Sequence, residues 1–151
     1  MSAFKHAVVC KANDGTPSHA FGRRTVRVTA AETGGAICVW DEPLPPGEGP
    51  PLHVHAREDE LFRVLEGRFR FWCGKETFEI GPDSTVVMPR GVPHRFQNTG
   101  EAEGRLMIAV MPGGFEGFFF DVERENPLTP EAIGAIAARY GLTFLPPDTE
   151  P

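Results

Sequence analysis

The chain has 151 residues, of which 40% are hydrophobic and 24% are charged, and its formal net charge is −6. This length predicts a single domain that buries about two thirds of the surface of its unfolded chain, and the composition is typical of a globular protein. The acidic balance provides no basic surface for a nucleic-acid backbone. No apolar run approaches the ~20 residues that a membrane helix needs, so we expect neither nucleic acid nor a membrane as a partner.

Three cysteines, Cys10, Cys38 and Cys73, cannot all pair with one another, and none of them has Cys-x-x-Cys spacing. Residues 1–10 lack the charged and then apolar pattern of a signal peptide. Together these features predict a reduced, cytoplasmic protein in which the cysteines pack as free thiols. We expect Cys73 to be a buried and unreactive thiol.

Short segments rich in Val, Ile and aromatic residues recur along the chain, separated by turns that contain Gly, Pro, Asn and Asp. The predicted strands are residues 6–10, 25–29, 36–40, 52–55, 61–65, 68–73, 77–80, 85–88, 94–97 and 105–111, and the Pro- and Gly-rich segment 43–51 interrupts the series. Strands about 8–12 residues apart with such turns are typical of a β-sandwich or a closed barrel.

The pattern changes after residue 113. Phenylalanines at positions 115, 118, 119 and 120 have the spacing of one helical face. A second helix is predicted to begin with Thr129 as its N-cap and Pro130 in its first position, and to end at Gly141. We therefore expect a barrel over residues 1–112 and a helical extension over 113–151 that packs on it. The segment Phe115 to Phe120 either packs on the barrel or forms a lid across its mouth.

One group of residues points to chemistry. His53 and His55 are two apart in a predicted strand, so their side chains project from the same face. Glu60 follows five residues later, and His94 lies in a later strand that a folded-back barrel can bring beside theirs. Imidazole nitrogens with one carboxylate form a ligand set suited to Fe, Mn, Ni, Cu or Zn.

The spacings around these residues resemble the two sequence signatures of the cupin superfamily. Residues 49–67 read Gly-x3-His-x-His-x4-Glu-x6-Gly, and residues 89–98 read Pro-x-Gly-x2-His-x3-Asn. Glu48 and Asp83 occupy positions where the signatures usually have Gly, and both lie in predicted turns. Within the superfamily, the Pro-rich segment before the histidines and the tail 129–147 look like small bacterial monocupins grouped with quercetin 2,3-dioxygenases.

The resemblance implies an all-β fold, a double-stranded β-helix or jelly-roll barrel, with His53, His55, Glu60 and His94 facing inward around one divalent transition metal. Fe, Mn or Ni is the metal expected, and Zn or Cu is also compatible. Three neutral imidazoles and one carboxylate leave a divalent ion with a net charge of +1. Four protein ligands leave about two positions of a six-coordinate ion open, as expected of a catalytic rather than a structural site.

The grouping implies a metal-dependent dioxygenase that acts on a small aromatic or enol-containing molecule, with Glu60 as the catalytic base once it leaves the metal. Two alternatives use the same barrel. One is an isomerase, lyase or decarboxylase that uses the metal as a Lewis acid, and the other is a non-catalytic protein that binds a small ligand. The family also implies a homodimer. Barrel and tail account for the whole length, so we expect no appended DNA-reading domain.

Five apolar residues are candidates for a substrate pocket above the metal: Phe62, Phe71, Met88, Phe96 and Met107. Phe62 shares the strand parity of the expected carboxylate ligand, and Phe96 shares that of the third histidine. Such a pocket would suit a planar or aromatic substrate. Simple core packing accounts for the same positions, so both interpretations stay open at this point.

Two acidic neighbours and one amide complete the candidates. Glu58 and Asp59 are expected to form a solvated acidic turn, although Asp59 could replace the carboxylate ligand if the spacing stretched by one residue. Asn98 is expected to cap the turn after its strand, or alternatively to orient His94.

Overall fold

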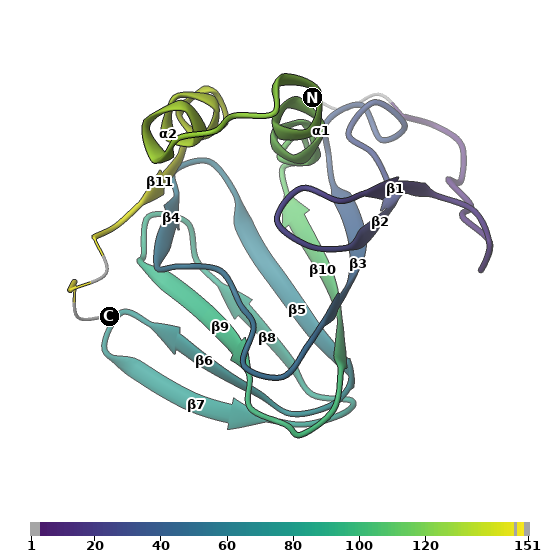
Figure 1. The fold of residues 1–151 in the computed structure, drawn as a ribbon. Coiled ribbons are helices and arrows are strands. Elements are labelled where there is room, and N and C mark those ends of the chain that lie inside the picture. The colour runs from purple at the N-terminus through teal and green to yellow at the C-terminus, as the bar shows by residue number, and fades with distance from the viewer. Residues whose placement is uncertain (1–3, 147, 150–151) are drawn as a thin grey trace.

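The computed structural model describes residues 4–146 and 148–149. Two antiparallel sheets face each other and enclose the core, with both helices at one end of the barrel (Figure 1). One sheet has six strands in the order β1-β2-β3-β10-β5-β8, and the other has five in the order β11-β4-β9-β6-β7. The all-β jelly-roll barrel expected from the sequence is confirmed.

Most strands are short, and turns connect them. Their bounds are β1 (Thr16–Ser18), β2 (Arg24–Val28), β3 (Cys38–Leu44), β4 (His53–His55), β5 (Asp59–Glu66), β6 (Phe69–Cys73), β7 (Glu76–Ile80), β8 (Thr85–Met88), β9 (His94–Asn98), β10 (Gly104–Met111) and β11 (Leu142–Phe144). The strands predicted between residues 25 and 111 are all present, with ends shifted by a few residues.

The strand predicted at residues 6–10 is wrong, because this segment pairs with no strand and Val9 is 73% exposed. A run of β-branched residues forms a strand when a half-buried sheet surface receives it, and none does so here. The structure also contains two strands that were not predicted. β1 includes Pro17 and lies at the edge of its sheet, where a residue without a backbone N–H is tolerated.

Alternation along the strands decides what faces the interior. On β5 the buried positions are Glu60, Phe62 and Val64, and the residues between them are less buried. The Phe62 ring lies 5.2 Å from that of Phe71 and 5.0 Å from that of Phe96, measured between ring centroids. These edge-to-face contacts close one end of the interior, and each buried ring contributes about 1.5–3 kcal/mol of hydrophobic stabilisation.

The helices α1 (Glu116–Glu125) and α2 (Pro130–Arg139) cover the other end (Figure 1). Phe115 and Phe119 pack against Trp40, with ring centroids 6.2 and 5.5 Å away. The predicted N-cap of α2 is confirmed, because the Thr129 hydroxyl accepts a hydrogen bond of 3.2 Å from the Ala132 amide. Within the described part of the chain, neither helix has the length and apolar character needed to cross a membrane.

The tail is not wholly helical. After α2 the chain enters β11, which pairs with β4 so that Leu142 lies opposite His55 and Phe144 lies opposite His53. The extension expected at 113–151 therefore adds a strand beside the histidines as well as two helices. Residues 147 and 150–151 of that range, and residues 1–3 of the expected barrel, lie outside the described residues.

Candidate metal centre

The four residues singled out by spacing meet in the barrel interior. β4 carries His53 and His55, and β9 places His94 directly opposite His53. Glu60 reaches the same point from β5 in the other sheet. One donor atom from each of the four lies within 4.8 Å of the others, and all four side chains are buried. The two sheets thus bring the candidate ligands together from three strands.

Backbone carbonyls orient two of the imidazoles. Nδ1 of His53 lies 2.8 Å from the carbonyl oxygen of Pro51, and Nδ1 of His94 lies 3.1 Å from that of Val92. A carbonyl oxygen can only accept, so Nδ1 carries the proton in both rings. Nε2 is then free to act as a donor atom toward a metal ion.

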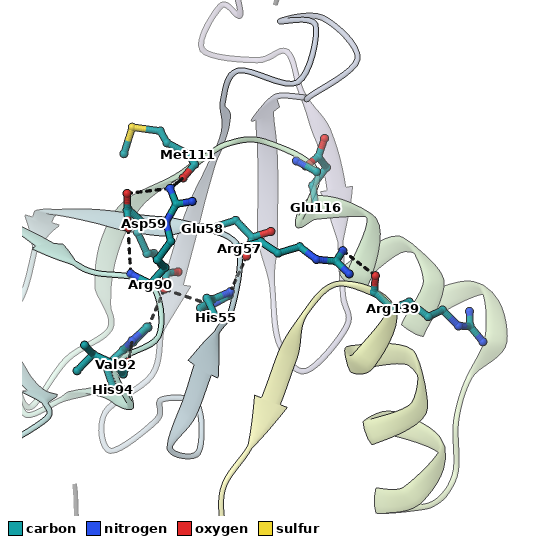
Figure 2. Close-up of polar contacts among 12 residues, drawn as sticks. His55, Arg57, Glu58, Asp59, Arg90, Val92, His94, Met111, Glu116 and Arg139 are labelled. Atoms are coloured by element: carbon teal, nitrogen blue, oxygen red, sulfur yellow. Dashed lines mark hydrogen bonds and ion pairs between the residues drawn. The ribbon is translucent and has the colours of Figure 1, made fainter. Parts of the chain in front are cut away.

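The third imidazole lies against a carboxylate instead. Nδ1 of His55 is 3.4 Å from Oε2 of Glu58 (Figure 2). Nε2 of His55 faces Oε2 of Glu60 at 3.4 Å. Among the described residues, His55 Nδ1 and Glu58 Oε2 are the buried side-chain polar atoms that have no hydrogen-bond partner. These two orphaned atoms face each other, so a small rotation lets Glu58 accept the Nδ1 proton and directs Nε2 inward.

This placement corrects the expectation of a solvated acidic turn, because Glu58 is only 5% exposed. Asp59 lies on the outer face, where its carboxylate accepts hydrogen bonds from the backbone amide and the guanidinium of Arg90 at 2.9–3.1 Å. These hydrogen bonds lower the pKa of Asp59 to about 2. Asp59 is therefore engaged away from the centre. Strand parity was the available signal, since Glu58 shares the parity of Glu60.

Burial and mutual proximity set the protonation of the cluster. Burial, together with the neighbouring His94, lowers the pKa of His53 to about 3, so this ring is neutral at pH 7. Burial also lowers the pKa of His55, but the carboxylates of Glu60 and Glu58 outweigh it and raise the pKa overall. Burial raises the pKa of Glu60, but the nearby His55 and the close contact with His94 outweigh it and lower the pKa, so Glu60 is ionised.

The arrangement fits a metal ion on its own chemistry. Three imidazole nitrogens and one ionised carboxylate converge in a buried site, and a cation there would engage the inward-facing Nε2 atoms, while Glu58 stands beside Nδ1 of His55 as a carboxylate that can orient the ring. A divalent first-row transition metal suits this donor set. The donor atoms alone are compatible with Fe, Mn, Ni, Cu or Zn.

Asn98 and Cys73 have structural environments. The Asn98 amide donates to the carbonyls of Leu44 and Ala102 at 2.8 and 2.9 Å, and its oxygen accepts from Gly100. It therefore holds the turn after β9, as expected. Cys73 is free and buried, and burial raises the pKa of its thiol, which keeps it unreactive at neutral pH.

A cavity of about 790 Å³ opens onto the cluster. His53, His55 and Glu60 line it at one end. Its aromatic walls include Trp40, Phe96, Phe115, Phe118, Phe119 and Phe144. The segment Phe115 to Phe120, expected as either packing or a lid, is packed in place and forms part of this wall.

The expected pocket residues need correction. Of the five, Phe96 lines the cavity. Phe62, Phe71 and Met88 are at most 1% exposed and fill the closed core below it. Met107 is partly exposed and lies between the inward-facing neighbours Leu106 and Ile108, so it is on the outer face of β10. Shared parity placed the phenylalanines on the inner face, but it could not show at which level of the barrel the open space begins.

The cupin domain family model matches residues 40–111. Polyketide synthase CurC of Streptomyces cyaneus is 30% identical over 111 residues, which cover 74% of this chain and 68% of that protein. This chain belongs to the cupin superfamily. Tetracenomycin polyketide synthase protein TcmJ of Streptomyces glaucescens is 26% identical over 98 residues, covering 64% of this cupin and 66% of TcmJ. The matched region covers less than two thirds of the length of some other relatives, 55% in one and 49% in another.

The fold likeness extends to solved structures. A structure described as a predicted oxalate decarboxylase from Thermotoga maritima matches with a TM-score of 0.60 and 22% identity, over 69% of this cupin and 98% of that chain. At this identity the likeness shows the fold alone. The grouping with quercetin 2,3-dioxygenases stays a prediction.

Proposed function

We propose that this cupin is a metal-dependent oxidoreductase of the dioxygenase type that acts on a small aromatic or enol-containing molecule. The main support is that a buried cluster of three histidines and one glutamate lies at the end of an aromatic-lined cavity of about 790 Å³. Cavities of about 300–1,000 Å³ are typical of small-molecule sites. The cluster therefore lies where a bound substrate would meet it.

In this proposal His53, His55, Glu60 and His94 hold the metal ion. When bound, a redox-active ion would supply electron exchange between an anionic substrate oxygen and dioxygen. Both atoms of dioxygen enter the product, so the reaction needs no external reductant. Four protein donors leave about two positions of a six-coordinate ion for the two small molecules.

The protein must first remove a proton from the substrate hydroxyl. Glu60 is the group that can accept it, because its lowered pKa keeps the carboxylate ionised at neutral pH. Its Oε2 atom lies 2.9 Å from Nε2 of His94. Turning Oε2 from His94 toward the substrate would create a stronger base, since losing that partner raises the pKa of Glu60.

The aromatic walls orient the substrate and exclude water. Phe115 packs edge-on against the His55 ring, with centroids 4.5 Å apart, and so lies at the boundary between cluster and cavity. Phe118 and Phe119 continue this wall along the cavity. A planar ring that packs against such side chains gains about 0.5–1.5 kcal/mol per aromatic contact beyond its area burial.

The similarity to CurC and TcmJ, both named as polyketide synthase proteins, favours an enol-rich carbon skeleton as the substrate. The same similarity favours a second candidate function, a non-oxidative isomerase, lyase or decarboxylase that uses the metal as a Lewis acid on such a skeleton.

Oxygen consumption separates the two candidates. Purified protein, with its metal identified by elemental analysis, is mixed with quercetin and other flavonols in an oxygen electrode. We expect one dioxygen consumed per substrate and both atoms of labelled dioxygen in the product. His94→Ala should abolish uptake, whereas the exposed His19→Ala serves as the matched control and should not. Turnover under strict anaerobiosis would refute the dioxygenase and favour the second candidate, and binding without turnover in either atmosphere would leave a binding protein.

A further inference from the structure

A charged pair lies in the cavity wall away from the candidate metal ligands. Arg24 on β2 and Glu42 on β3 both line the cavity, and their side chains are 3% and 14% exposed. In the sheet order, β2 is separated from β5, which carries Glu60, by β3 and β10. At about 4.8 Å per strand spacing, the β2 backbone lies about 14 Å from that of β5, and the β3 backbone lies about 10 Å from it. The pair therefore faces a part of the cavity remote from the metal centre.

The pair is held firmly by its surroundings. Nη1 of Arg24 donates to the carbonyl oxygen of Ala20, and the guanidinium lies 3.8 Å from the ring centroid of Phe119. On the other side, Nε1 of Trp40 donates to Oε2 of Glu42 at 2.9 Å. A cation over an aromatic face and an indole hydrogen bond both favour one fixed geometry. Neither side chain is a mobile surface group.

The contacts between the two charges are loose despite this support. Nη2 of Arg24 lies 3.4 Å from Oε1 of Glu42, and Nε lies 3.5 Å from Oε2. Ion pairs of this kind usually have N–O distances of about 2.7–2.9 Å. Within the described part of the chain, the 3.4 Å contact is the one hydrogen bond that Oε1 accepts. A carboxylate offers about four acceptor positions, so Oε1 retains the capacity to accept another hydrogen bond.

The chemistry of the pair indicates its ligand. Glu42 is the more exposed partner, and its negative charge disfavours a carboxylate or phosphate at this point. A neutral donor fits instead, because a buried acceptor left open costs free energy that a hydroxyl group would recover. The aromatic walls on both sides accept a flat ring.

We propose that Glu42 accepts a hydrogen bond from a hydroxyl group at the end of a planar aromatic substrate remote from the metal ligands, and so selects hydroxylated over unsubstituted rings. Arg24 and Trp40 position the Glu42 carboxylate. This inference rests on the proposed function in one respect, namely that the cavity receives an aromatic molecule.

A purely structural role makes a different prediction. If the pair served only to tie β2 to β3 and to α1, replacing Glu42 would lower stability and leave ligand selectivity unchanged. The decisive measurement is therefore a ratio of affinities within each variant. Such a ratio is insensitive to the fraction of protein that is folded or loaded with metal.

The experiment uses the metal-loaded protein with 3-hydroxyflavone, 3,7-dihydroxyflavone and 3,4′-dihydroxyflavone as probes. Each dihydroxy compound carries one hydroxyl group more than 3-hydroxyflavone, and the two added groups lie at opposite ends of the molecule. Titration calorimetry should show at least one dihydroxy compound binding about tenfold tighter than 3-hydroxyflavone, as expected for a hydrogen bond to a charged acceptor. Glu42→Ala should reduce this preference to near unity while 3-hydroxyflavone still binds. Glu42→Gln keeps an acceptor oxygen, so it should retain part of the preference for the dihydroxy compound. If Glu42→Ala fails to fold, Glu42→Gln serves as the test variant. Glu101→Ala removes an equal charge from an exposed residue that is not part of the cavity lining, and it should leave the preference intact.

Equal affinities for all three probes in the natural protein would overturn the inference, as would a preference that survives in Glu42→Ala. The outcomes also separate this inference from the proposed function. Oxygen uptake without a hydroxyl preference refutes the role of Glu42 alone, and a preference without oxygen uptake supports that role and refutes the dioxygenase. Failure of the natural protein to bind any of the three flavones would overturn both.

Discussion

The two ends of the barrel interior are built by the same strands and differ sharply in chemistry. On β5, Glu60 at the open end is followed two residues later by Phe62 at the closed end. On β9, His94 is followed two residues later by Phe96, which packs against Phe62 and also lines the cavity. Alternation brings all four side chains to the inner face, and one step of two residues separates a candidate metal ligand from a core ring.

The difference shows how packing at the closed end can fix the positions of the strands that carry the candidate metal ligands. The closed end is filled with interlocking rings, so the strands that carry the ligands cannot shift relative to one another without disturbing the core. The open end contains the described buried polar side-chain atoms that lack partners, His55 Nδ1 and Glu58 Oε2. The closed end is thus filled by packed rings, and the described buried side-chain polar atoms without partners lie at the open end.

Removing a ligand should have the largest effect, and it should be confined to the open end. In His94→Ala we expect metal content after dialysis to fall from about one ion per chain to near zero, because one of the three imidazole donors is lost. Elemental analysis measures this directly, with His19→Ala as the control. Full metal content in His94→Ala would disprove the assignment of the site.

The complementary change is Phe62→Ala at the closed end. Loss of this fully buried ring should lower the free energy of unfolding by about 3–5 kcal/mol, because it removes apolar contacts and leaves a cavity. Denaturant unfolding measures the loss, and the folded fraction should still bind one metal ion. If metal binding disappeared while stability stayed unchanged, the assignment of core packing to the closed end and metal binding to the open end would be incorrect.

A smaller effect is expected from Glu58→Gln, which tests how the open end is organised. Replacing the carboxylate by an amide removes the negative charge that faces His55 Nδ1 and weakens the acceptor there, and such changes typically lower metal affinity about 10–100-fold. Competition with a chromophoric chelator gives the affinity. Asp59→Asn is the matched control, because the carboxylate of Asp59 is next in sequence but pairs with Arg90 on the outer face. Equal affinities in the two variants would exclude a positioning role for Glu58.

The smallest effect concerns the tail that covers the open end. Burial and the hydrogen bond to Asp121 raise the pKa of Tyr140 to about 12. A raised pKa means that the stabilisation by the neutral phenol is fully present below pH 10 and is lost as the pH rises through about 12. Tyr140 is the single tyrosine, so ultraviolet absorbance reports its titration. Asp121→Asn should move the midpoint down toward 10, and an unshifted midpoint would argue against this contact.

The sequence predicted the ligand cluster well, because spacing within a strand determines the facing of a side chain. His53 and His55 had to share a face, and the spacings of the two cupin signatures related them to Glu60 and His94. The structure brings these four residues together. Homodimerisation and a cytoplasmic location stay predictions.

Features that depend on contacts between distant segments were harder to foresee. Parity put Phe62 and Phe71 on the inner face, but the level at which the cavity begins depends on where α1 packs. The roles of Arg24 and Glu42 required knowing that β2 and β3 are neighbours. β11 has three residues and takes its conformation from pairing with β4, so no local pattern marks it.

The pairing of β11 with β4 also lets the C-terminal tail prevent association between copies of the chain. β4 has β9 on one side and β11 on the other, with Phe144 opposite His53. A chain cut before Leu142 would leave the backbone amides and carbonyls of β4 unpaired along a free sheet edge, which is a template for strand addition by another copy. Truncation at this point should therefore promote aggregation that starts at the strand bearing two of the candidate metal ligands.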